Sequence, residues 1–556
     1  MLLAISTASI NAQSLVVTLD SDEICAGETI TATVRGPEIP LNSPAADNNN
    51  NRGIMFDLVG VEGAIIKGFT TNVLTPVGVS IEVYYRTGSF VGFEDSNVGW
   101  TLLGSSTGIP MGTGVDIGVE LDQVILAGQT LGFYVTCSGA GEDIFYATSL
   151  NEVGDELASN QYLTLNTGVG KEYPFGVTYE KRDFIGSVIY EPIVTDIVWN
   201  GNTSTTETAD FTLTQSGAII ATGMYGGFER KGGALITVND YEVNAMATPS
   251  VLGWDESSTL SAEVTQKKGL GTSFQAGNGN TGAMFDITAT NALSVNGITV
   301  YTEDAGTPVV EVFFKTGTFV GSEANAGAWT SLGTTTALTA GDASYIALSS
   351  SISVAPGQTI GLYVTRTDAN NVFYTNGTGV GNVVAMDDNL TIKEGKGVSY
   401  PFGAVNNNRI LNTVVHYEVE NPAGLTYSWA PGGASSASVV VTPNGDVTYT
   451  VTVGDGDCEA TGDAAVSMAL GIEDALAESI SVYPNPASDA ITIQAEQSMD
   501  VQQIVLLDVS GKIVFSTAPT TAFTTATIPV SHLAKGMYVL QLNVNANLTN
   551  RKVIVE

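Results

Sequence analysis

The sequence predicts an all-β protein built on two homologous, jelly-roll-like antiparallel sandwiches. Three observations lead to this fold class. Glycine accounts for 62 of the 556 residues, beside abundant Thr, Val, Ser and Asn, a composition typical of short strands joined by tight turns. Stretches rich in Val, Ile, Tyr and Phe, such as VSIEVYY from Val79, recur at about the 8 to 12 residue spacing of antiparallel sandwiches and jelly rolls. The third observation is an internal duplication.

One long segment of the sequence is written twice. YYRTGSFVGFE at Tyr84–Glu94 recurs as FFKTGTFVGSE at Phe313–Glu323, an offset of 229 residues (84 to 313). The same offset relates GIMFDL to GAMFDI and AGQTLGFYVT to PGQTIGLYVT, and each copy ends with a YPFG stretch. A period this long indicates a duplicated domain-sized unit rather than a solenoid repeat. We therefore predict the two sandwiches at residues 52–191 and 281–420.

The charge balance and the N-terminal segment limit the classes of function. Asp and Glu outnumber Lys and Arg by 57 to 20, which gives a net charge of -37. Such a surface repels phosphate backbones, so we expect no nucleic-acid binding. No apolar run is long enough for a transmembrane helix. Residues 1–13 begin with a short apolar segment, which predicts the remnant of a signal peptide; an N-terminal strand is the alternative.

The segments beside the sandwiches carry a different pattern. SDEICAGETITATV from Ser21 and YSWAPGGASSASVVV from Tyr427 resemble the two halves of an immunoglobulin-like module found in secreted Bacteroidetes proteins. Cys25, Trp429 and Cys458 match the positions of that module's cysteines and tryptophan. The resemblance implies half-modules at residues 14–51 and 421–470, with a degenerate immunoglobulin-like connecting module at residues 192–280.

The resemblance leaves two ways for the half-modules to pair. In a nested arrangement the outer halves pair with each other, and the resemblance then implies a disulfide between Cys25 and Cys458. In a tandem arrangement Cys25 faces Phe228 and Trp254 faces Cys458, which leaves two orphan thiols. This complementary loss favours the nested arrangement, while the tandem arrangement stays open. Cys137 is expected to remain free in either case.

After a linker predicted at residues 471–479, residues 480–556 have the pattern of a small β-sandwich. Two prolines in YPNPA restrict the backbone before a strand of period two, and DVSGK provides a hairpin turn. In this order, YPNPA, DVSGK, KGMY and the closing KVIV resemble the type A C-terminal sorting domain of the Bacteroidetes type IX secretion system. The residues that carry the resemblance are Tyr483, Pro484, Asn485, Pro486, Gly511, Lys512, Lys535, Gly536, Tyr538 and Lys552.

The resemblance implies a route and a destination. It predicts export, interaction with the type IX secretion machinery, and a final location that is extracellular or at the cell surface, with attachment to the outer membrane as one form.

Residues suited to catalysis or metal binding are scarce. Histidine occurs only at His416 and His532, and the chain has no HExxH, paired CxxC, Walker or GxSxG motif. We therefore expect no enzyme, no metal site and no cofactor. Two possibilities stay open: a glycoside hydrolase pair among the many carboxylates, and calcium bound by the acidic or Asn-rich turns at Asn48, Asp387 and Asp455.

The repeated YYRTGSFVGFE stretch has two interpretations. In the structural one, Tyr84 and Phe313 point inward, Thr-Gly forms a turn, and the following Phe and Trp fill the core. In the functional one, the other aromatic, the base and the acid of each copy form a platform that stacks on a sugar and hydrogen-bonds to it. The structural interpretation is favoured. The candidate binding residues of the functional one are Tyr85, Arg86, Glu94, Phe314, Lys315 and Glu323.

Together these features predict a secreted or cell-surface protein, non-catalytic, that acts in adhesion or binds an extracellular glycan or protein. Duplication favours binding because two weak sites on one chain gain avidity. A structural spacer or matrix component is one alternative, and a polysaccharide-degrading hydrolase is another.

Overall fold

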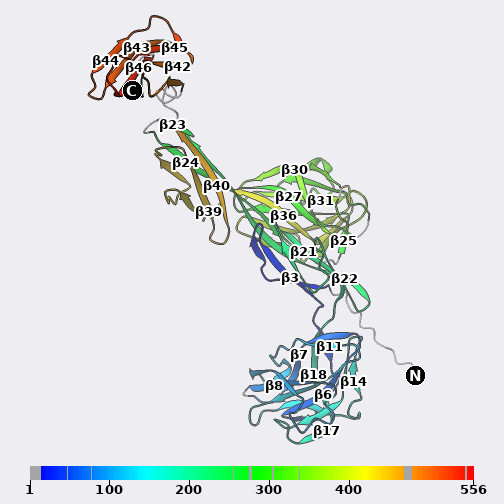
Figure 1. The fold of residues 1–556 in the computed structure, drawn as a ribbon. Helices are drawn as coiled ribbons and strands as arrows, with labels where there is room; N and C mark the ends of the chain where they lie inside the picture. The colour runs from blue at the N-terminus through cyan, green and yellow to red at the C-terminus, as the bar shows by residue number, and fades with distance from the viewer. Residues whose placement is uncertain are drawn as a thin grey trace. The chain divides into compact units, whose positions relative to one another are not determined.

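A computed structural model describes residues 14–46, 48–76, 78–253, 256–274, 278–303, 306–336, 338–468, 479–544 and 547–556. The all-β prediction is confirmed (Figure 1). In these ranges the regular secondary structure consists of β-strands and one short 3₁₀ helix, η1 (Ala326–Ala328). No helix in the described ranges has the length and hydropathy needed to span a membrane. The predicted signal remnant 1–13 and most of the predicted linker lie outside these residues.

The chain divides into two compact units. The first comprises Met1–Asp240 and Gln266–Glu420, and the second comprises Tyr241–Thr265 and Asn421–Glu556. Both sandwiches belong to the first unit, and the sorting domain belongs to the second.

The first sandwich is an antiparallel structure with an apolar interior. Its strands are β4 (Ile39–Asn42), β5 (Asn49–Asn51), β6 (Gly53–Gly60), β7 (Gly63–Val73), β8 (Val79–Thr87), β9 (Thr101–Ile109), β10 (Gly112–Asp116), β11 (Gln123–Leu126), β12 (Thr130–Cys137), β13 (Ile144–Thr148), β14 (Glu156–Ser159), β15 (Leu163–Asn166), β16 (Gly168–Lys171), β17 (Thr178–Phe184) and β18 (Gly186–Pro192).

The second sandwich repeats this set with small changes. Its strands are β25 (Asn278–Asn280), β26 (Gly282–Ala289), β27 (Leu293–Tyr301), β28 (Val310–Thr316), β29 (Thr330–Thr335), β30 (Ala343–Val354), β31 (Thr359–Arg366), β32 (Val372–Asn376), β33 (Val383–Met386), β34 (Leu390–Val398), β35 (Val405–Leu411) and β36 (Thr413–Glu420).

Strand order and register are the same in both copies. The path β17-β16-β6-β12-β8-β9 of the first sandwich recurs as β35-β34-β26-β31-β28-β29, and the neighbours β18-β7 recur as β36-β27. Asp57 of β6 lies opposite Gly132, and Asp286 of β26 lies opposite Gly361. The central strands β6 and β12 are buried along nearly their whole length, which explains why they are almost continuously apolar.

The segments predicted to be immunoglobulin-like pair differently from the nested arrangement that we predicted. In the first unit, β3 (Thr29–Arg35) lies between β1 (Val16–Leu19) and β20 (Thr208–Thr212). The early half-module therefore pairs with the segment predicted as a separate connecting module. This pairing gives β3 an apolar face, in which Ile30, Ala32 and Val34 are buried.

The second unit shows the same tandem pattern. Here β24 (Ser258–Gly271) pairs with β38 (Ser438–Val441), and β23 (Val251–Leu252) pairs with β40 (Glu459–Met468). In the same sheet, β39 (Val447–Gly454) lies between β37 (Thr426–Ala430) and β40. The backbone thus follows the tandem alternative. The cysteine positions indicated only which side chains could bond to each other. Which segments form one module depends instead on main-chain hydrogen bonds between strands.

The state of the three cysteines is separate from this strand pairing. Cys25 and Cys458 are each disulfide-bonded, whereas Cys137 is a buried free thiol. Tandem strand pairing therefore leaves neither Cys25 nor Cys458 as an orphan thiol. The pairing of these two with each other stays a prediction, which non-reducing peptide mapping tests.

The C-terminal part of the second unit is a small sandwich of two sheets. One sheet has β42 (Ala490–Met499) between β41 (Ile480–Tyr483) and β45 (Phe523–Pro529). The other has the order β44 (Ile513–Thr517), β43 (Val501–Asp508), β46 (Gly536–Val544) and β47 (Asn547–Val555). Asn485 of YPNPA links to the last strand: its Nδ2 donates to the Lys552 carbonyl and its Oδ1 accepts from the Ile554 amide, both at 2.8 Å.

Candidate functional site

The repeated YYRTGSFVGFE stretch is held by a buried carboxylate. Asp57 accepts hydrogen bonds from Ser89 Oγ at 2.5 Å and from the Phe90 amide at 2.9 Å. Asp286 makes the same two bonds, at 2.5 and 2.9 Å, to Thr318 and the following amide. Burial raises the pKa of both carboxyls above the ordinary value of 3.8, while these hydrogen bonds act in the opposite direction. The Thr-Gly turn is therefore a structural element of each sandwich.

Aromatic side chains of the stretch build a second apolar cluster beside the main core. In the first copy, Tyr84, Phe90 and Trp100 pack with Tyr134 and with Phe175 of the YPFG loop, and the Tyr134 and Phe175 ring centroids are 5.2 Å apart. The second copy repeats the cluster with other residues: Phe313, Phe319, Trp329, Tyr363 and Phe402. The motif recurs because this part of the fold recurs.

Two of the candidate binding residues point the wrong way for a sugar platform. Tyr85 and Phe314 pack against the principal core of their sandwiches, while Tyr84 and Phe313 belong to the second cluster. Tyr84 and Phe313 thus point inward, as the structural interpretation predicts, but the residues that follow them are packed as well instead of being available to a ligand. Both faces of this strand are covered by apolar groups, so the period of two does not reveal which face is innermost.

The basic candidate binding residues make contacts within their own loops. The Arg86 guanidinium lies over the Phe93 ring at 3.6 Å. Lys315 Nζ donates to the Thr318 carbonyl at 2.5 Å and to the Thr316 carbonyl at 3.1 Å. Ser322 takes the place of Phe93 in the second copy, so the Arg86 stack has no counterpart there.

The two candidate acids also differ between copies. Glu323 accepts from Lys396 Nζ at 2.5 Å and from the Gly321 amide at 2.7 Å. In the first copy the acid that meets a lysine is Asp95 rather than Glu94: Lys171 Nζ donates to Asp95 at 2.8 Å. The six candidate residues therefore do not form one repeated binding surface.

The acidic turns considered for calcium make local hydrogen bonds. Asp387 Oδ1 accepts from the amides of Asn389 and Leu390, and Asp455 Oδ1 accepts from the amides of Asp457 and Cys458. Within the described part of the chain, no group of three or more His, Cys, Asp or Glu side chains is arranged to hold a metal ion.

A pocket lies at the same register in both sandwiches, beside the strand pairs β18-β7 and β36-β27. His416 of β36 lies opposite Gly297, as Ile189 of β18 lies opposite Gly68. The neighbours of His416 along the strand belong to the core, so His416 itself faces the opposite side of the sheet. The pocket volume is about 390 Å³ at Ile189 and about 170 Å³ at His416.

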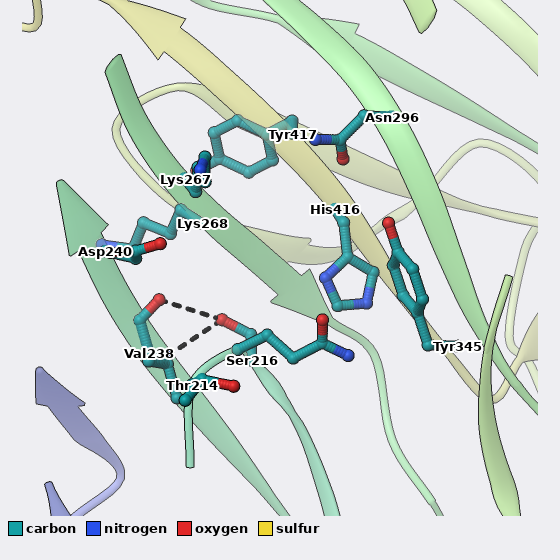
Figure 2. Close-up of a pocket in the computed structure, with 11 residues that line it drawn as sticks. Thr214, Ser216, Val238, Asp240, Lys267, Lys268, Asn296, Tyr345, His416 and Tyr417 are labelled. Carbon is teal, nitrogen blue, oxygen red and sulfur yellow. Dashed lines mark hydrogen bonds between the residues drawn. The ribbon is translucent and has the colours of Figure 1, made fainter. Parts of the chain in front are cut away.

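The His416 pocket is polar and partly aromatic (Figure 2). His416 Nε2 shares a hydrogen bond of 2.7 Å with Thr299 Oγ1, and the imidazole meets the Tyr345 ring edge-on, with centroids 4.8 Å apart. Burial lowers the pKa of His416 to about 4, so the imidazole is neutral at neutral pH. The residues that line the pocket include Ser216, Asp240, Lys268, Asn296, Tyr345 and His416.

Two further side chains shape this pocket. Asn296 Nδ2 donates to Glu418 at 2.9 Å, and its buried Oδ1 has no hydrogen-bond partner in the described structure. Ser216 Oγ accepts from the Val238 amide at 2.9 Å and donates to the Val238 carbonyl at 3.3 Å (Figure 2). These two hydrogen bonds hold the Ser216 side chain in place in the pocket lining.

The equivalent pocket of the first sandwich has a charged lining. Lys67 forms an ion pair with Asp122 and lies 3.9 Å from Glu191. Burial raises the pKa of Glu191, against the opposing effects of Lys67 and Arg35. Three more acids line the same pocket: Glu38, Asp116 and Glu120.

Sequence reasoning missed both pockets. The signal that was present is the set of differences between the copies: His416 replaces Ile189 and, at the offset of 229 (67 to 296), Asn296 replaces Lys67. A single polar residue in an apolar strand of one copy marks a position where the fold alone does not dictate the side chain.

Residues 481–556 match the protein family described as the secretion system C-terminal sorting domain. The chain is accordingly exported to the extracellular space or the cell surface, and its sorting domain interacts with the type IX secretion machinery. None of the curated proteins compared with the chain matches it.

Three solved structures show weak similarity. A biofilm associated protein, in its BSP domain, is 9% identical, with 98% of this chain and 96% of that chain covered and a TM-score of 0.12. The N-terminal CBM22-1-CBM22-2 tandem domain from Paenibacillus barcinonensis Xyn10C is 11% identical, with 68% and 90% covered and a TM-score of 0.12. CBM51-2 in complex with GlcNAc and INT domains from Clostridium perfringens ZmpB is 8% identical, with 65% and 92% covered and a TM-score of 0.12. Similarity at these TM-scores supports no inference about this chain.

Proposed function

We propose that the exported chain is a non-catalytic binding protein that attaches to an extracellular glycan or protein through its two sandwiches. The observation that carries this proposal is the pocket at the same register in both copies, lined by different side chains. Concave regions with a few convergent polar groups are the usual form of ligand sites.

The use of the carboxylates at the repeated stretch supports a non-catalytic role. Hydrolysis of a glycosidic bond needs two carboxyl groups about 5 to 10 Å apart that face the substrate. Asp57 and Asp286 are instead buried and hold turns, and Glu323 is engaged by Lys396. A carboxylate that holds a turn is not presented to a substrate.

A glycan array probed with the full chain, with and without calcium, tests the proposal. The same chain is incubated with each polysaccharide that it binds, and newly formed reducing ends are measured. Binding without new reducing ends is the expected result. New reducing ends would overturn the non-catalytic role in favour of a hydrolase. If the folded chain binds neither a glycan nor an extracellular protein, it acts as a spacer or matrix component.

A further inference from the structure

The His416 pocket is assembled from segments that are distant in the sequence. Ser216 follows β20, and Asp240 and Lys268 lie on β22 (Phe228–Thr248) and β24. Asn296 and His416 come from the adjacent strands β27 and β36. All of these residues belong to the first unit. A cavity of about 170 Å³ is smaller than the roughly 300 to 1,000 Å³ typical of drug-sized ligands, so its occupant is a small molecule or one residue of a polymer.

We propose that this pocket binds one neutral sugar residue, such as the terminal unit of a glycan. This inference rests on the proposed binding function and names its ligand class. A sugar hydroxyl both donates and accepts hydrogen bonds, and the pocket offers both kinds of group. Asp240 supplies acceptor oxygens, Lys268 supplies donor hydrogens, and the neutral imidazole of His416 has a second nitrogen beyond the one that meets Thr299.

Tyr345 provides the apolar element of the site. Its side chain is 38% exposed, and it contacts the His416 imidazole edge-on. An aromatic ring that is partly exposed beside hydrogen-bonding groups suits the C–H face of a pyranose ring, because its body is apolar while its surroundings are polar.

The charges of the pocket favour a neutral ligand over an anion. Lys268 Nζ already pairs with Glu23 at 3.1 Å, and Asp240 lines the same pocket. His416 carries no charge at neutral pH because burial lowers its pKa to about 4. Lys267 also lines the pocket, so the charges of Lys267, Lys268, Asp240 and Glu23 sum to zero and an anionic ligand would meet no net positive charge.

The first sandwich supplies the contrast that makes the site specific to the second. At the matching positions it has Ile189 for His416, Lys67 for Asn296 and, at the offset of 229 (116 to 345), Asp116 for Tyr345. The aromatic ring and the neutral hydrogen-bonding groups are therefore absent from the equivalent positions. We expect the Ile189 pocket not to bind the same sugar.

Saturation-transfer difference NMR and calorimetric titration on the full chain test this inference. The probes are D-glucose, D-galactose, D-mannose, L-fucose, N-acetylglucosamine and D-glucuronate. At least one neutral sugar is expected to bind, and His416→Ile and Tyr345→Asp, which copy residues of the first sandwich, each weaken it about tenfold. Tyr400→Asp is the matched control, because Tyr400 is also 38% exposed and does not line the pocket.

The outcomes separate this inference from the proposed function. Equal sugar affinity in wild type and both pocket variants would overturn the pocket assignment and leave the binding function intact. Binding of glucuronate alone would overturn the neutral class. If no sugar binds but the glycan array or a protein partner is positive, only this inference fails; if those are negative as well, both fail. Thermal unfolding identifies a misfolded His416→Ile chain, in which case Tyr345→Asp, at a partly exposed position, decides.

Discussion

Four phenylalanine rings meet in the core of the first sandwich: Phe56, Phe69, Phe133 and Phe184, with centroid separations between 4.7 and 6.1 Å. At the matching positions the second sandwich has Phe285, Ile298, Leu362 and Leu411. Strand order is unchanged. The same backbone therefore accepts a largely aromatic or a largely aliphatic core, as long as the volume is filled and the pattern is kept.

The turn and the pocket show opposite degrees of change between the copies. The buried carboxylates of Asp57 and Asp286 make the same bonds in both copies, because a misplaced turn would disturb the aromatic cluster beneath it. At the pocket, Ile189 of the first copy is replaced by His416 in the second, while the glycine opposite it on the adjacent strand is retained. Features retained after duplication thus report on the fold, and features that changed are the better guide to ligand recognition.

The largest effect is expected in the ring-rich core. Phe133→Ala should lower the free energy of unfolding by about 3 to 5 kcal/mol, because it removes a fully buried ring and leaves a cavity. Chemical denaturation followed by fluorescence measures the change. The matched control is Phe93→Ala, since Phe93 is 40% exposed. If both variants unfold at the same denaturant concentration, the ring cluster does not stabilise the first sandwich.

The next largest effect is a pH dependence present in the second copy alone. The folded chain favours the neutral form of His416, since burial lowers its pKa from 6.5 to about 4. Its stabilising contribution is therefore complete above pH 6.5 and lost as the pH falls toward 4. Between pH 7 and 4, wild type should lose up to about 3 kcal/mol more than His416→Ile. Parallel stability curves would show that the imidazole is not buried.

A smaller effect with the opposite sign is expected at the turn carboxylates of both copies. Burial raises the pKa of Asp57 and Asp286, so the folded chain holds these protons more tightly than the unfolded chain. Their contribution to stability is greatest below pH 3.8 and decreases as the pH rises through the folded pKa. Asp57→Asn and Asp286→Asn should each make this decrease in stability less steep. At neutral pH each should change the free energy of unfolding by about 1 to 2 kcal/mol.

Thermal unfolding between pH 3 and 8 measures both variants. Similar changes in the two copies would sharpen the view that the turn is a shared structural element. A change in one copy alone would contradict the view that the turn has the same structural role in both copies.

The smallest effect is expected at the charged residues of the repeated stretch. Arg86→Ala removes the contact with Phe93 and should cost about 0.5 to 1 kcal/mol. Because the hydrogen bonds of Lys315 within the described residues go to carbonyl groups of its own loop, Lys315→Ala should cost no more than this. Glycan binding should be unchanged in both variants, and a large loss of binding in either would restore the stretch as a ligand site.

The fold class and the sorting domain were predictable because each rests on local patterns: strand periodicity, turn residues and a short ordered motif set. The packing of Tyr85 against the principal core was not predictable, because a period of two does not show that apolar groups cover both faces of the strand. The tandem pairing of β3 with β20 joins segments far apart in the chain, and the cysteines pointed to another arrangement. The His416 pocket needs strands from five parts of the chain, so no local pattern could assemble it.

The link between Asn485 and the last strand has a consequence for the sorting domain. Both hydrogen-bond partners of the Asn485 side chain are backbone groups of β47. A chain whose synthesis stops before Lys552 lacks both partners, so the YPNPA segment has no strand to be fastened to. The ordered form of this segment therefore depends on β47, so removal of that strand would also release the YPNPA segment, whose Asn485 lies 67 residues before Lys552 in the sequence.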